Sequence, residues 1–473
     1  MGRDTLACIV LAAGLLLAGC VRYEPRPIDP SRFAADLDSR TLADAGLKVF
    51  MEKALGHEVS PWPVQSWTSD LLTLAAMYYH PDMDLTRARW GIARTATKTA
   101  GEVPNPTISI QPGYDTTTFE PSPWIVSANV DFPIETANKR GYRITEAKHS
   151  AEAARSGILS AAWQVRSRLV RAMLDYVGSH ELAELLRQQQ ASREQIVRLM
   201  ELQQPQGNIP PTEVTQARIA LRNTRLAVLE SQRQSAESRV QLADAIGVPV
   251  AALQQIRIDL PLTEELPEAV SSAEVRKRAL TGRADVLASL AEYGASQAAL
   301  QLEIAKQYPD IHLGPGYEYD QGDNKWFLGL GLTLPVLNQN RGPIREAEAK
   351  RTEAAMKFTA LQAKIIADVD RAVLAYEAAR LKLIVAKELR TDVQKQRRAA
   401  EASFKVGEIS KLELTGVQLE LQTSEQAIAE ARIKAHQARL AVEESLQQTL
   451  NVPESAVLPW PRNPSPAQER KAK

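Results

Sequence analysis

Two segments, PTISIQPGY at 106–114 and PDIHLGPGY at 309–317, share a first proline, alternating aliphatic residues and a final Pro-Gly-Tyr. A second match follows each of them, because residues 124–133 and 326–335 both begin with tryptophan and end with proline. Three further matches occur in the same order: 138–141 with 340–342, 207–209 with 407–409, and 246–249 with 450–453. Ordered self-similarity is the signature of an internal repeat. The chain is therefore predicted to be a duplicated unit, and each copy reads helix, two strands, long helix, turn, helix.

The predicted strands alternate between apolar and polar residues. In 126–132 the even positions are apolar and the odd positions polar, and in 328–334 leucine fills every even position. This period of two indicates that one face meets lipid or a core. Strands of about 9 to 11 residues can cross a bilayer when tilted, but four strands cannot close a barrel and leave unsatisfied edges in lipid. Spanning strands would thus require several copies of the chain; a soluble sheet packed on helices is the alternative.

The other segments predict helices that are too long for a globular core. No proline interrupts 143–203, which would extend about 90 Å as one helix, and 346–406 could match it. Apolar and small residues at 162, 165, 169, 172, 176, 179, 183 and 186 follow the three-four spacing of a tightly packed coiled coil. Returning helices at 212–245 and 410–450 would complete two antiparallel hairpins. We therefore expect a mainly α fold with a small membrane β part.

The N-terminus predicts secretion and lipid anchoring. An apolar run from Leu6 to Ala18 is shorter than the roughly 20 residues of a membrane span and reads as a signal peptide. It ends in Leu17-Ala18-Gly19-Cys20, which resembles the lipobox of bacterial lipoproteins, so that Cys20 would be lipidated and anchored. Val21 stands where many inner-membrane lipoproteins have aspartate, which favours the outer membrane. An ordinary signal peptide with a chance cysteine is the alternative.

Composition and motifs exclude several classes of function. The 57 Lys+Arg balance 57 Asp+Glu, which disfavours nucleic-acid binding. The two cysteines, Cys8 and Cys20, leave no cysteine-based zinc site or thiol nucleophile in the rest of the chain. No phosphate loop, His-Glu-x-x-His pair or Gly-x-Ser-x-Gly elbow is present, and the six histidines at 57, 80, 149, 180, 312 and 436 lack ligand spacing. We expect neither an enzyme nor a resident cofactor or metal.

The duplicated pattern behind a lipobox resembles the TolC-like outer membrane efflux family over nearly the whole mature chain. The resemblance rests on the strand exit 334–342, the helix entry 346–349, the hairpin tip 404–409, and the Asn105-Pro106 and Tyr308-Pro309 steps. It implies a homotrimer with a twelve-stranded β-barrel in outer-membrane lipid and an α-barrel tunnel in the periplasm. It also implies a periplasmic adaptor and an inner-membrane pump, of the RND type in the heavy-metal branch. The segment 132–141 is most similar to that Czc- or Cus-type branch.

The resemblance also implies roles at the hairpin tips. In the family, acidic residues shortly after the tip glycine ring the periplasmic aperture, which points to Glu213 and Glu413, with Arg218 placed for a constraining ion pair. A second acid often follows three residues on, but Gln216 and Gly416 occupy those positions here. Solvated carboxylates at a helix start are the alternative. The adaptor would dock on the tip residues Gly207, Ile209, Val406, Gly407 and Ile409.

These expectations divide the chain into five segments. They are a signal peptide at 1–19, an N-terminal periplasmic extension at 20–66, repeats at 67–260 and 261–460, and a tail at 461–473. We expect a passive efflux channel that favours metal cations; a multidrug or type I secretion channel is the alternative. A periplasmic adaptor would need a lipoyl-like β-domain between its hairpin arms, and an envelope scaffold would not need alternating strands in both copies.

Overall fold

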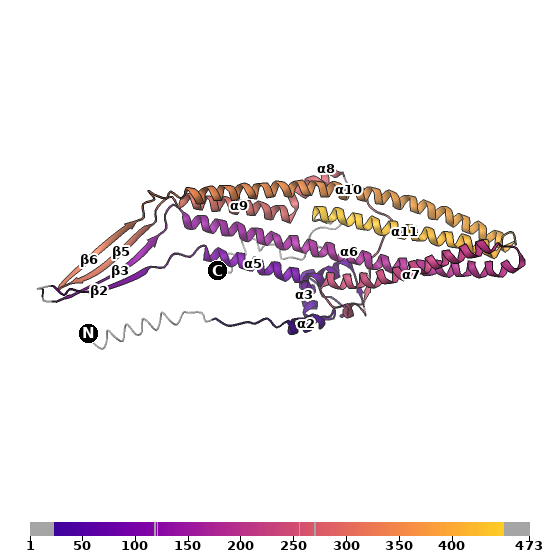
Figure 1. Cartoon of the computed structure of the whole chain (residues 1–473), viewed down its shortest axis with the longest axis horizontal. Coiled ribbons are helices and arrows are strands. Elements are labelled where there is room, and N and C mark those ends of the chain that lie inside the picture. The colour runs from indigo at the N-terminus through magenta and orange to yellow at the C-terminus, as the bar shows by residue number, and fades with distance from the viewer. Residues whose placement is uncertain (1–22, 118–119, 121, 255, 269–270, 449–473) are drawn as a thin grey trace.

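The molecule is long and narrow, with a β-sheet at one end and, at the other, the two turns that connect the paired long helices (Figure 1). The computed structural model describes residues 23–117, 120, 122–254, 256–268 and 271–448. The signal peptide 1–19, Cys20 and the tail 461–473 lie outside the described residues. Long helices run side by side between the sheet and the turns.

The two copies of the repeat have closely matched elements. The long helices α6 and α10 have 65 residues each, and the returning helices α7 and α11 have 36 each. The first copy consists of α4 (Ser69–Tyr79), α5 (Pro81–Thr99), β2 (Thr107–Tyr114), β3 (Trp124–Ile134), α6 (Lys139–Gln203), η1 (Gln204–Gln206) and α7 (Pro211–Ile246). The second consists of α8 (Ser272–Gly282), α9 (Ala284–Ala305), β5 (Ile311–Asp320), β6 (Asp323–Leu332), α10 (Arg341–Lys405) and α11 (Lys411–Leu446). The predicted duplication and the mainly α fold are therefore confirmed.

Both long helices begin a few residues earlier than the predicted starts at 143 and 346. Asn138 and Asn340 precede them with left-handed φ values of 59° and 57°, a conformation that asparagine tolerates. Pro343 then lies in the first turn of α10, where a missing backbone N–H breaks no helical hydrogen bond. At about 1.5 Å per residue, each 65-residue helix spans nearly 100 Å.

The four strands form one antiparallel sheet in the order β2-β3-β5-β6. Its register pairs Ile108 with Val130 and Leu313 with Leu330, so apolar residues of neighbouring strands share a face. Ser109 pairs with Asn129 on the opposite face. The predicted alternation is therefore confirmed, whereas β2 has eight residues instead of the predicted nine to eleven. The strands β2 and β6 are the free edges of this sheet.

The N-terminal extension folds against the first repeat. Helices α2 (Pro30–Asp38) and α3 (Ala45–Leu55) precede β1 (Ser66–Trp67), which pairs in parallel with β4 (Arg257–Ile258), and η2 (Val250–Leu253) precedes β4. Leu47, Met51 and Trp67 are fully buried in the same apolar cluster as Leu72 and Leu169. The extension shares this core with α4 and α6, so the segment 20–66 is not detached from the repeat that follows it.

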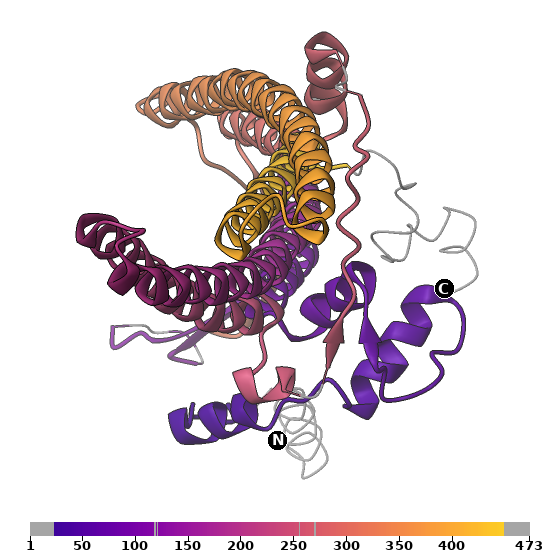
Figure 2. The ribbon, with the colours of Figure 1, turned by 90° about the vertical axis from the view of Figure 1, so that its right-hand side faces the viewer.

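The long helices form a curved layer. Toward the sheet, α6 packs against α5 and α9, and α9 packs against α10. Toward the turns, α6 packs against α7 and α11, and α11 packs against α10. Figure 2 shows the layer end-on as an arc, with α2, α3 and α8 on its outer side. The positions of the predicted three-four stripe on α6 are buried apart from the half-buried Tyr176: Ala162, Val165, Leu169, Ala172, Ser179, Ala183 and Leu186. Four of them, at 162, 165, 169 and 172, belong to the core shared with the N-terminal extension.

Candidate functional site

The apolar face of the sheet is exposed. On β6, Trp326, Leu328 and Leu330 are 81%, 69% and 67% exposed, and Ile108 on β2 is 69% exposed. Tyr114 packs edge-on against Trp124 at 5.1 Å between ring centroids, and Tyr317 packs against Trp326 at 5.0 Å. Soluble monomers rarely expose a contiguous apolar surface of this kind, which marks a face that another apolar phase covers. No helix among the described residues is both long and apolar enough to cross a bilayer.

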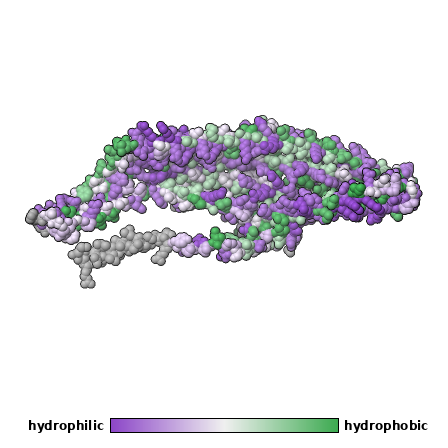
Figure 3. Space-filling model, in the orientation of Figure 1, coloured by the Kyte–Doolittle hydropathy of each residue, from purple (hydrophilic) through white to green (hydrophobic). Residues whose placement is uncertain are grey.

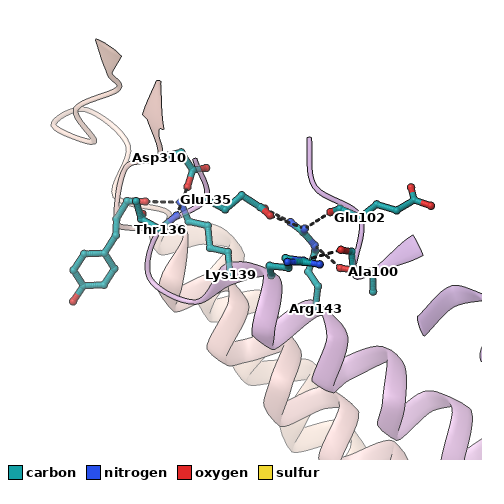
Figure 4. A network of polar contacts seen from close by, with 10 residues as sticks. Ala100, Glu102, Glu135, Thr136, Lys139, Arg143 and Asp310 are labelled. Atoms are coloured by element: carbon teal, nitrogen blue, oxygen red, sulfur yellow. Dashed lines mark hydrogen bonds and ion pairs between the residues drawn. The ribbon is translucent and has the colours of Figure 1, made fainter. Parts of the chain in front are cut away.

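A polar network joins the sheet to the start of α6 (Figure 4). The buried Lys139 Nζ donates to Asp310 Oδ1 at 2.7 Å and to the Tyr308 carbonyl at 2.6 Å. The Thr136 backbone N–H also donates to Asp310 Oδ1, at 2.9 Å. Burial alone would raise the pKa of Asp310, but the hydrogen bonds from Lys139 and Thr136 outweigh it and hold that pKa below its usual value. Because Asp310 immediately precedes β5, the network fixes the first copy's helix to the second copy's strand.

A second set of contacts in Figure 4 fixes α6 to the end of α5. Arg143 forms a two-pronged ion pair with Glu135, and it also donates to the carbonyls of Ala100 and Glu102 at 3.4 Å. Arg140 Nε donates to the Gly101 carbonyl at 2.7 Å. These residues hold the angle between sheet and helices. In the sequence, 138–141 marks the repeat and belongs to the segment 132–141 that resembles the heavy-metal branch, but its charged residues had no predicted role. Their partners lie far along the chain, and local pattern does not show such pairs.

The second copy fixes the same junction differently. Asn340 donates through Nδ2 to the carbonyl and to the Oε2 of Glu303, at 2.7 and 2.9 Å. Lys306 also pairs with Glu303, at 2.6 Å. Burial would raise the pKa of Glu303, but the hydrogen bonds from Lys306 and Asn340 lower it below its usual value. In the second copy these contacts join the end of α9 to the start of α10, just as Arg140 and Arg143 join the end of α5 to α6 in the first copy.

The two turns at the end far from the sheet, around Gly207 and Gly407, have similar backbone conformations, but their apolar side chains differ in exposure. Gly207 and Gly407 have φ values of 75° and 80°, and nothing lies near the space that a Cβ would occupy in either. Val406 is 72% exposed and Ile409 is half-buried, whereas Ile209 is buried at 8% exposure. Of the tip residues predicted to dock an adaptor, the second turn therefore presents the more accessible apolar group.

The three residues predicted to gate the aperture are not brought together in one network. Arg218, which the sequence placed within reach of Glu213, pairs instead with Glu201 on α6 at 2.6 Å. Five residues along a helix place two side chains on different faces, whereas Glu201 lies across the hairpin. Glu413 forms a capping box with Ser410: its carboxylate accepts from the Ser410 N–H at 2.7 Å. Glu213 occupies the corresponding turn of α7, where Pro210 provides no side-chain cap.

The histidines take structural positions among the described residues. His312 contacts Asp131 at 2.9 Å across the polar face of the sheet, and His436 contacts the Thr263 carbonyl at 2.9 Å. His80 is buried, and burial lowers its pKa below the usual value although Asp82 opposes that effect. Within the described part of the chain, no group of three or more His, Cys, Asp or Glu side chains is arranged to hold a metal ion.

Two relatives whose names state a function match part of the chain. The cobalt-zinc-cadmium resistance protein CzcC of Cupriavidus metallidurans is 23% identical over 233 residues, which cover 48% of this chain and 55% of CzcC. The pyoverdine export outer membrane protein OpmQ of Pseudomonas putida is 29% identical over 215 residues, which cover 42% of this chain and 44% of OpmQ. The chain thus spans about half the length of the curated relatives it matches.

Solved structures share the fold over most of the chain. CusC aligns with a TM-score of 0.63 and 14% identity, covering 80% of this chain and 91% of CusC. VceC of Vibrio cholerae aligns with a TM-score of 0.64 and 16% identity, covering 81% of this chain and 97% of VceC. The family described as "Outer membrane efflux protein" matches residues 80–248 and 275–447, which are the two copies of the repeat. The resemblance seen in the sequence is thereby confirmed, and the chain belongs to the outer membrane efflux protein family.

Proposed function

We propose that the protein is the outer-membrane channel of a tripartite efflux system and acts as a passive trimeric conduit from periplasm to exterior. The observation that carries this proposal is a sheet with two free edges and an exposed apolar face, joined to an arc of helices. In lipid, unpaired strand edges are too costly to persist, so further copies would pair with β2 and β6. Three copies would give twelve strands, and the three arcs would enclose a tunnel.

Exposed apolar residues on the outermost helices of the arc support this assembly. Helix α10 exposes Leu374, Leu381 and Val385, and α7 exposes Ile219, Leu226 and Leu229. Their spacings of three, four and seven residues are those of a coiled-coil seam. These two helices flank the arc near the tips, so α10 of one copy could pack against α7 of the next.

The partners and location follow from the same proposal. A periplasmic adaptor would dock on the tip residues Gly207, Ile209, Val406, Gly407 and Ile409, and it would connect the channel to an inner-membrane pump of the RND type. The sheet would lie in outer-membrane lipid and the helices in the periplasm. Lipidation of Cys20 remains a prediction from the sequence.

The aperture would be set by the residues next to the tips. Arg218 would brace α7 against α6 through its pair with Glu201, and Glu213 with Glu413 would contribute carboxylates to the rim. Exposed ion pairs contribute only about 0 to 1 kcal/mol each, so contact with an adaptor could exchange such a brace. The rim carboxylates would favour cations at this level.

Replacing Gly407 with valine is expected to abolish export while trimers persist. A β-branched residue does not adopt the left-handed φ of 80°, so the turn that presents Val406 to an adaptor would rearrange. Export activity and trimer content on unheated gels measure the two effects. Gly56→Val is the matched control, because Gly56 has a φ of 75° and open surroundings but ends α3, far from the tips. Export that survives Gly407→Val would contradict docking at this turn.

The two relatives support different cargoes for the proposed channel. Similarity to CzcC supports cobalt, zinc or cadmium ions as cargo, and similarity to the pyoverdine export protein OpmQ supports an organic solute as the alternative. Deleting the protein is expected to sensitise cells to cobalt, zinc or cadmium more than to a drug panel, with the restored gene as control. Sensitivity to drugs alone would overturn the metal assignment, and no sensitivity to either panel would count against efflux.

A further inference from the structure

Three hollows join into one trough on the inner side of the arc. They enclose roughly 810, 520 and 420 Å³. The first two share Gln164, Asp285 and Leu361, and the last two share Ala375, so they are continuous. The largest is walled by α5, α6, α9 and α10, which follow one another across the layer, so the trough lies on the concave face. Figure 2 shows that curvature, and Figure 3 shows a mostly hydrophilic surface between sheet and tips.

The trough carries more cations than its carboxylates can neutralise. Its acids are paired or face a cation: Glu444 with Arg171 at 2.9 Å, Asp285 with Arg283 at 2.6 Å, Asp368 with Arg371 at 3.2 Å, and Glu292 toward Lys357. Lys357 also pairs with Glu353 at 2.8 Å. Three further lining residues, Arg89, Lys364 and Lys434, are exposed and form no ion pair with any described residue. We call these three residues the cation belt.

Small residues leave open space beside Arg89, the belt residue that lines the largest hollow. The α6 wall of the largest hollow consists of Ser150, Ala153, Ala154, Gly157 and Ser160, among other short side chains. Long side chains opposite such a wall can extend into the open space. In a ring of copies, each belt residue would recur on every subunit and face the same enclosed water. Rings of Lys and Arg select anions, and low-dielectric walls strengthen their field.

We propose that the cation belt makes the part of the tunnel along the trough selective for anions, in series with a rim whose carboxylates favour cations, so that the cargo crosses this part as a multivalent anion and not as a free divalent cation. This inference rests on the proposed function, because the concave face is a lumen only in the closed ring. Two sources share the required chemistry: a free organic polycarboxylate, and a metal ion held in an anionic chelate. Metal export would then use the chelate form.

Thiol labelling at Ala375 tests the sign of the field without requiring an open aperture. Ala375 is exposed and lines two of the hollows, and Ala375→Cys would report the local potential. We expect anionic sulfonatoethyl methanethiosulfonate to react about fivefold faster than the cationic trimethylammonium reagent at low salt, a difference that shrinks with added salt. The reference is Ala273→Cys on the outer helix α8, and the unsubstituted protein gives the background from native cysteines.

Charge reversal supplies the matched control. Adding R89E/K364E/K434E to Ala375→Cys is expected to invert the preference, whereas R32E/K53E/K277E, three exposed cations on the outer helices, should leave it unchanged. Protection of the thiol by citrate and by the zinc–citrate complex, at constant ionic strength, distinguishes the two anion sources. A reagent ratio equal to that at Ala273→Cys, or protection by Zn²⁺ alone, would overturn the inference. If crosslinking of the unsubstituted protein gave no trimers, that result would instead contradict the proposed function.

Discussion

Replacing Val130 with arginine is expected to prevent stable insertion of the trimer into the outer membrane. Val130 lies near the middle of β3, pairs with Ile108, and belongs to the apolar face of the sheet. A cationic side chain on the lipid face near the bilayer midplane costs about 2 to 4 kcal/mol in a membrane β-barrel, and every subunit would carry the same cost. The amount of unheated trimer in the outer-membrane fraction measures the effect, and export should fall with it.

The neighbouring residue provides the matched control. Asn129→Arg adds the same side chain to the same strand at nearly the same depth, but Asn129 pairs with Ser109 and Gly316 on the polar face. In a closed ring that face would line water, so this variant should assemble close to normal levels. If Val130→Arg assembled as well as Asn129→Arg, the apolar face would not meet lipid and the conduit proposal would fail.

Local sequence pattern was sufficient for the strands and long helices of the two repeats, because each is defined by a period, but it predicted none of the elements of the N-terminal extension. Leucines at alternate positions of 328–334 predicted a strand with one apolar face toward lipid or a core, and in the structure Leu328 and Leu330 share one face of β6 and are exposed. The unbroken run after Gly141 predicted a helix of about the observed length. The exact start was missed, since an asparagine in the left-handed conformation at 138 and a glycine inside the first turn resemble a loop until their backbone geometry is known.

Local sequence pattern did not predict which distant segments contact one another. The pairing of β1 with β4 involves only two residues on each strand, separated by most of the first repeat. Lys139 looked like any charged residue at a helix start, yet it is buried against Asp310. The partner of Arg218 was sought along its own helix and lies on the opposite one. Each miss involves a charge or an edge whose partner is determined by packing and not by spacing.

Neutralising Glu443 is expected to destabilise the helical layer more than neutralising the adjacent Glu444. Glu443 on α11 is 6% exposed and accepts from Arg166 on α6 at 3.5 Å and from Arg439 at 3.3 Å. The Arg166 guanidinium, 8% exposed, also lies 5.2 Å from the centre of the Trp163 ring. Removing one member of a buried ion pair leaves the other charge desolvated and uncompensated, at a cost of about 3 kcal/mol. Glu443→Gln should therefore lower the guanidinium midpoint for unfolding of the detergent-solubilised trimer.

Glu444, the adjacent carboxylate, provides an exposed control that separates the effect of burial from the effect of removing a charge. Glu444 pairs with Arg171 at 2.9 Å, but their side chains are 47% and 56% exposed, so Glu444→Gln should cost no more than about 1 kcal/mol. Replacing both Arg166 and Glu443 with methionine removes the buried charges together, and apolar replacements of similar volume are often neutral or stabilising. That double variant should recover most of the stability lost in Glu443→Gln, because Arg439, at 24% side-chain exposure, can turn to water. Equal midpoints for Glu443→Gln and Glu444→Gln would show that the Arg166–Glu443 contact is too well solvated to hold α6 and α11 together.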